Sequence, residues 1–182
     1  MTQFEFVLVF ISIVAAFAVS DILANWGEQI RLRHRVRHYP LHTAWMGLLL
    51  FVMMQVWWSL WGLNEKMGWT FGQYLALVFP FLTLALMAYI LTPNLDDEED
   101  IKKHYFETST WFFSLAAIYL CAWAFYTYVI VGKPISEPGS PYRLAGTILM
   151  VVLAAWQNER VHIAAVVLAY LLMGAWIATV VL

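Results

Sequence analysis

The chain has 182 residues, of which 63% are hydrophobic and only 12% are charged, and its formal net charge is −2. A soluble domain carries roughly 25% charged residues, so this composition excludes an ordinary soluble globule and indicates an integral membrane protein. The small net charge gives no reason to expect a nucleic-acid partner, and a single cysteine, Cys121, excludes an internal disulfide within one chain.

Six apolar stretches approach or exceed the length needed to cross a bilayer, which is roughly 20 residues. They cover residues 4–25, 41–63, 70–92, 105–131, 142–157 and 161–182. The fifth stretch reaches only about 24 Å, so it either spans a locally thin bilayer or forms half of a re-entrant hairpin with the sixth. We expect one all-α domain over residues 1–182. It is a polytopic transmembrane helical bundle with six spans in three helical hairpins, and five spans plus a re-entrant hairpin is the alternative.

The inner half of the first predicted helix carries three polar residues on one face. Asp21, Asn25 and Glu28 stand at positions i, i+4 and i+7. A carboxylate below the lipid headgroups is costly and usually faces protein or water. We therefore expect either a polar clasp, in which Asp21 pairs with an arginine or histidine of the next connection, or a functional vestibule.

The connection between the first two predicted helices, IRLRHRVRHYPLHTAW, is strongly basic and also contains His34, His38 and His42. Pro40 interrupts a helix here, so these histidines should not share one helical face. No HExxH-type zinc signature is present, and no metal site is predicted. Together with later connections, the strip should form a cytoplasmic anchor that contacts anionic lipid headgroups. The anchor consists of Arg31, Arg33, Arg35, Arg37, His38, His42, His104, Arg160 and His162.

Two stretches at the start of even-numbered helices align without a gap. RHYPLHTAW (residues 37–45) and KHYFETSTW (residues 103–111) share a basic residue, histidine and tyrosine at the first three places and tryptophan at the ninth. A repeated hairpin would place Trp45 and Trp111 in matching directions and could give pseudo-threefold packing. The alternative is that no repeat exists, because the preference of basic and aromatic residues for the membrane–water interface also places them at helix ends.

No cofactor is predicted from this sequence. The alternative is a metal ion or haem held by His38, His104 and His162, which would require the hairpins to pack around one axis.

The second basic connection follows a run of acids, residues 96–100, which precedes Lys102 and Lys103. Acids at the start of a helix suit the helix dipole, and the run could also dock on the arginines of the first connection.

The predicted midplane contains no charged residue, and only Pro80 offers the kind of helix break that transporters use. No nucleophile elbow or phosphate-binding loop is present, so an enzyme is not expected. We expect an accessory or scaffold subunit of a membrane assembly, or a homo-oligomer. The first alternative is an oligomeric channel or small transporter with its cytoplasmic mouth near Asp21 and Glu28. The second is a haem- or quinone-handling membrane redox protein.

The distribution of basic residues predicts the orientation of the chain. With both termini outside the inner membrane, the cytoplasmic connections hold seven lysines and arginines and the outer ones hold three. Reporter fusions at both termini of this multi-pass protein should therefore report the periplasmic side. A carboxyl-terminal reporter that is active only in the cytoplasm would contradict the sixth span or the orientation.

Overall fold

The computed structural model describes residues 2–63, 68–95 and 100–181, and in this part of the chain it is a bundle of six α-helices without strands. The helices are α1 (Gln3–Arg31), α2 (Pro40–Ser59), α3 (Phe71–Leu91), α4 (Ile101–Phe125), α5 (Ser140–Ala155) and α6 (Glu159–Trp176). A short 3₁₀ turn, Leu60–Leu63, follows α2, and short π-helical turns, Tyr126–Ile130 and Ile177–Val181, follow α4 and α6. The all-α bundle predicted from the sequence is confirmed.

The helix starts are set by local side chains. Thr2 accepts a hydrogen bond from the backbone N–H of Glu5, and the Glu5 carboxylate accepts one from the Thr2 N–H, at 3.1 and 2.8 Å. The side chains of Asp100 and Asn158 accept hydrogen bonds from backbone N–H groups in the first turns of α4 and α6, respectively. α2 begins at Pro40, because a missing N–H costs little at the first position of a helix.

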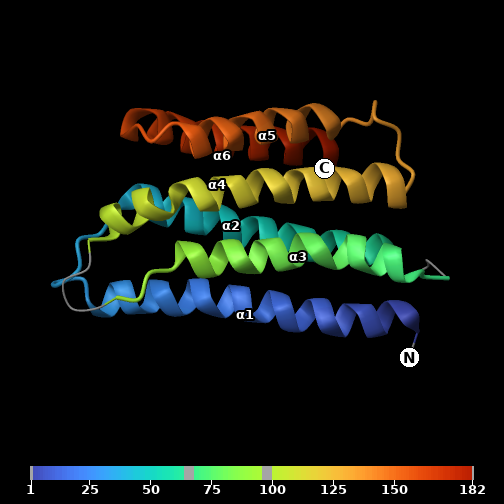
Figure 1. Ribbon diagram of the computed structural model, residues 1–182, viewed down its shortest axis with the longest axis horizontal. Coiled ribbons are helices and arrows are strands. Elements are labelled where there is room, and N and C mark those ends of the chain that lie inside the picture. Colours follow the sequence, from blue (N-terminus) through green and yellow to red (C-terminus); the bar gives the residue numbers. More distant parts are fainter. Residues whose placement is uncertain (1, 64–67, 96–99, 182) are drawn as a thin grey trace.

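Five of the helices are long and apolar enough to cross a membrane, and α5, with 16 residues, is the shorter one. α5 and α6 run along α4, parallel to the bundle axis, and the two termini lie toward the same end (Figure 1). The chain thus passes along the bundle six times, and its apolar helices suggest a multi-pass membrane protein.

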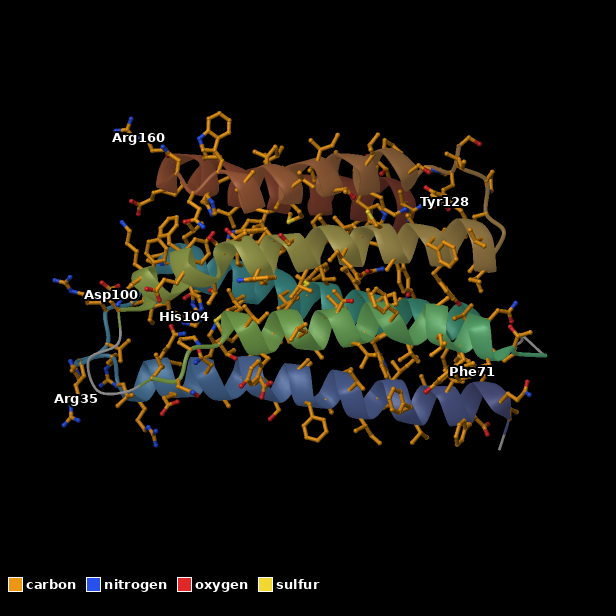
Figure 2. The ribbon with its side chains drawn as sticks, in the orientation of Figure 1. Arg35, Phe71, Asp100, His104, Tyr128 and Arg160 are labelled. Carbon is orange, nitrogen blue, oxygen red and sulfur yellow. The ribbon has the colours of Figure 1, made fainter. Side chains whose placement is uncertain are left out.

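The two ends of the bundle differ in character. Arg35, Asp100 and Arg160 lie at one end, and Phe71 and Tyr128 lie at the other (Figure 2). We call the first the basic end; it holds the connections that follow α1, α3 and α5. We call the second the terminal end, because both chain termini lie toward it.

The helices form two layers (Figure 1). α1, α3, α4 and α5 lie side by side in one layer, while α2 and α6 lie behind them. α1 packs chiefly on α3 rather than on α2, and α4 packs on α5 as closely as on α3. The suggested pseudo-threefold arrangement is therefore wrong, because two of the closest helix pairs join different hairpins.

The two aligned stretches take up different registers. Trp45 is 2% exposed inside the bundle, whereas Trp111 is 69% exposed on its surface. α2 begins three residues after Arg37, but α4 begins two residues before Lys103, because Pro40 sets the start of α2. The predicted internal repeat is therefore wrong, and the similarity reflects residue types that helix ends favour.

The two layers approach closely at Gly47 of α2. The hydroxyl of Tyr170 in α6 donates to the carbonyl of Ala44 at 2.9 Å. A Cβ at position 47 would lie 3.2 Å from that hydroxyl and 3.9 Å from the ring of Trp26 in α1. A small residue here lets α1, α2 and α6 meet, as small residues do between membrane helices.

Replacing Gly47 with valine should lower the free energy of unfolding by about 1–3 kcal/mol, because the added methyl groups must displace Tyr170. Thermal unfolding of the purified protein in one detergent measures the effect. The matched control is Gly174→Val in α6, where a Cβ meets nothing within 4 Å. If both variants lose the same free energy of unfolding, the loss comes from the helix propensity of valine and not from packing at Gly47.

Candidate functional site

Two buried amides on α1 join it to the end of α3. The side-chain amide of Asn25 donates to the carbonyl of Pro93 at 2.8 Å, and Gln29 donates to the Asn25 side-chain oxygen at 2.7 Å. Gln29 also lies 3.9 Å from the sulfur of Met46 in α2. Asn25 and Gln29 are 5% and 9% exposed. A polar clasp therefore exists on α1, but it differs from the predicted one. It is formed by side-chain amides and not by a carboxylate, and it binds the end of α3 and not the connection after α1.

The two acids of the predicted clasp have other environments. Asp21 is half-buried and forms no hydrogen bond or ion pair with any described residue. Glu28 pairs with Arg31 at 2.8 Å, on the same exposed face of α1. The predicted pairing of Asp21 with a cation of the first connection is thus not found in the described ranges.

Two histidines bind the last carbonyls of α3. His42 of α2 places Nε2 at 2.7 Å from the Leu91 carbonyl, and His104 of α4 places Nε2 at 3.2 Å from the Ile90 carbonyl. Because a carbonyl only accepts, Nε2 carries the proton in both rings. The rings meet edge to face, with their centroids 6.5 Å apart. The last carbonyls of a helix have no partner within the helix, so this pair closes α3 from two sides.

A third histidine closes the turn between α5 and α6. His162 is fully buried, donates from Nε2 to the Trp156 carbonyl at 3.0 Å, and accepts at Nδ1 from the Tyr105 hydroxyl at 2.7 Å. The rings of Tyr105, Phe106 and Phe113 surround it at centroid distances of 5.3 to 5.6 Å. Both ring nitrogens are therefore occupied within this chain.

The starts of α2, α4 and α6 are joined through one carboxylate. Glu159 accepts from the Tyr39 hydroxyl at 3.1 Å and pairs with the Lys102 ammonium at 2.7 Å. The same ammonium lies 5.6 Å from the centre of the Tyr39 ring. Burial and the Glu159 carboxylate raise the pKa of the Tyr39 phenol, so its hydroxyl stays protonated and donates.

The first two connections at the basic end touch each other. Arg37 and Asp100 form an isolated backbone bridge. Beside it, Val36, Leu95 and Ile101 pack as a small buried apolar cluster. The expected docking of the acidic run on the arginines falls mainly on residues 96–99, which lie outside the described residues.

The remaining predicted anchor residues are exposed at the basic end. His38 and Arg160 are exposed, and Arg33 donates to the carbonyl of Ile30 at 3.2 Å within its own turn. Arg31 pairs only locally, with Glu28. Lipid headgroups would meet the exposed parts of such side chains if this end lay at a membrane surface.

The histidines proposed as ligands do not gather at one point. His38 is exposed, His104 meets His42, and His162 is enclosed by aromatic rings. Over residues 2–63, 68–95 and 100–181, no three His, Cys, Asp or Glu side chains are close enough together to hold a metal ion.

Sequence reasoning found the histidines but missed the partners that fix them. Tyr39, Tyr105 and Glu159 complete the network, and their contacts join residues 57 and 120 positions apart. No local pattern reports such contacts. No protein-family model, curated protein or solved structure matches the chain, so the site is interpreted from its geometry.

Replacing Tyr105 with phenylalanine should lower the free energy of unfolding by about 1–3 kcal/mol, because buried Nδ1 of His162 loses its donor. Chemical unfolding in detergent measures this loss. Tyr89→Phe is the control, since the Tyr89 side chain is 70% exposed and makes no hydrogen bond with the described residues. An unchanged stability in Tyr105→Phe would contradict a structural role for the pair.

Proposed function

We propose that the chain is a non-catalytic accessory or scaffold subunit of an assembly in a bacterial-type inner membrane. One observation carries this proposal: the amides and histidines that are buried or half-buried at the basic end bond to other groups of this same chain, although Nδ1 of His42 has no partner among the described residues. Asn25, His104 and His162 each bond to backbone carbonyls at helix ends. Groups used in this way hold helices together and leave little for a substrate.

The buried hydroxyls between the two ends support the same interpretation over the alternative of a channel. Thr83, Ser109 and Thr127 donate to carbonyls of their own helices, at 2.9, 3.0 and 2.8 Å. Among the described residues they form no continuous polar path along the bundle. A conducting pore needs such groups to replace the hydration shell of an ion.

An accessory subunit needs a surface for its partner, and α1 offers one at the edge of the bundle. Phe6, Ile13 and Phe17 stand at positions i, i+7 and i+11 of α1, and are 62%, 52% and 69% exposed. Aromatic side chains are enriched in interfaces between proteins. We assign this stripe to an apolar transmembrane helix of a partner subunit.

The basic end would face the cytoplasm in this assembly. Exposed arginines and lysines there would contact anionic lipid headgroups, which attract such residues by roughly 1 kcal/mol each. Both termini would then lie on the outer side of the membrane, in agreement with the distribution of basic residues.

Isolation from native membranes in mild detergent tests the accessory role. We expect one other membrane subunit to accompany the wild-type chain at a fixed ratio in native mass measurements. Alanine at Phe6 and Phe17 should remove that subunit, while the control Leu171→Ala on α6, at a side chain 65% exposed, should retain it.

Three results would contradict the proposal. If the wild-type chain purifies as a monomer with no other subunit, it has no partner to support. A homo-oligomer that conducts ions in vesicles would favour the channel. A haem absorption band in the purified protein would favour a redox role.

A further inference from the structure

A half-open cavity of about 180 Å³ lies between the two layers, on the side of the bundle away from α1. Its walls come from α2, α4, α5 and α6, with two residues of α3. Aromatic side chains are prominent among them: Trp45, Phe112, Tyr119, Trp123, Tyr142 and Trp176. At its inner end the cavity approaches the polar network, because Trp45 packs on Phe113, one of the rings around His162.

The cavity walls are mostly apolar, and Gln55 and Arg143 stand at the end nearer the chain termini, which we call its mouth. Farther from the mouth, Trp45, Phe112 and Ala116 are buried, and the indole N–H of Trp45 has no partner among the described residues. Toward the terminal end, Gln55 and Arg143 are half-buried. The Gln55 amide makes no hydrogen bond with the described residues. The pocket therefore suits an amphiphile with its polar group at the mouth.

Arg143 is the one charged residue among the cavity walls. One of its terminal nitrogens, Nη2, pairs with the Glu137 carboxylate and donates to the Tyr128 hydroxyl at 3.3 Å. Lys133, which does not line the cavity, pairs with the same carboxylate at 3.6 Å. The Nε of Arg143 is buried and donates to no atom of the described residues. An unpaired buried donor is costly, and an acceptor oxygen of a ligand would satisfy it.

We infer that this cavity binds a planar, ring-headed membrane amphiphile whose ring carries hydrogen-bond acceptor oxygens, the chemistry of a quinone. Aromatic side chains such as Trp123 and Trp176 among the walls favour contact with an aromatic-like planar ring over an acyl chain. An apolar cavity of about 150 Å³ accommodates a benzene ring, so this one holds a substituted ring. Arg143 and Gln55 supply donors for ring oxygens. The inference concerns binding alone and goes beyond the accessory role.

The test uses the full chain in phosphatidylcholine nanodiscs, titrated with a decyl-substituted benzoquinone. We expect saturable quenching of tryptophan fluorescence, because three tryptophans line the cavity. Arg143→Gln should raise the midpoint concentration about tenfold, as loss of a hydrogen bond to a charged group does. Lys133→Gln is the matched control: it removes a charge beside Glu137 but does not line the cavity, so the midpoint should stay unchanged.

A second pair of variants keeps the test valid if loss of Arg143 unfolds the chain. Ala116→Phe fills the buried bottom of the cavity and should abolish saturable quenching. Leu171→Phe adds a similar ring on the exposed face of α6 and should leave it intact.

Competition with decyl alcohol separates a ring site from a site for alkyl chains. We expect decyl alcohol not to displace the quinone. Displacement by the alcohol, or equal midpoints in Arg143→Gln and Lys133→Gln, would overturn the inference in favour of a bound lipid chain. Quenching without saturation, or quenching unchanged by Ala116→Phe, would overturn it outright. None of these results bears on the partner subunit, whose loss is tested at Phe6 and Phe17.

Discussion

A backbone carbonyl without a hydrogen bond inside an apolar bundle costs several kcal/mol, and every helix end leaves some of them unpaired. The basic end of this protein is built around that constraint. His42 and His104 bind the last carbonyls of α3, and His162 binds the carbonyl that follows α5. Asn25 binds the carbonyl of Pro93, just beyond α3. Because these four side chains come from α2, α4, α6 and α1, each bond also fixes how one helix sits against the end of another.

This arrangement divides the molecule into two parts with different consequences. At the basic end, Asn25 and the histidines bond to backbone carbonyls of this chain, and the exposed arginines face outward, where headgroups would meet them. At the terminal end, Arg143 and Gln55 keep unused hydrogen-bonding capacity beside an aromatic cavity. The proposed scaffold role follows from the first part, and the proposed ligand follows from the second. The two can coexist, since a subunit that holds a partner through α1 leaves the cavity on the opposite side free.

Much of the fold could be predicted because the bilayer thickness fixes the length of an apolar helix. The predicted spans match the observed helices within a few residues, except that α1 continues to Arg31 and α4 begins at Ile101. α1 is longer because Asn25 and Gln29 find partners inside the bundle, which a hydropathy pattern does not reveal. The site was less predictable. The histidines are visible in the sequence, but the bond between Tyr105 and His162 depends on packing across 57 residues.

We propose that the buried histidines serve the fold and not a metal ion or haem. Nitrogen chemical shifts of isotope-labelled imidazoles, recorded on the purified protein with and without added zinc or haem, test it most directly. We expect His42, His104 and His162 to carry their proton on Nε2, and we expect neither addition to shift their signals. Signals of protons on Nδ1, or a shift of these resonances when metal or haem is added, would contradict it.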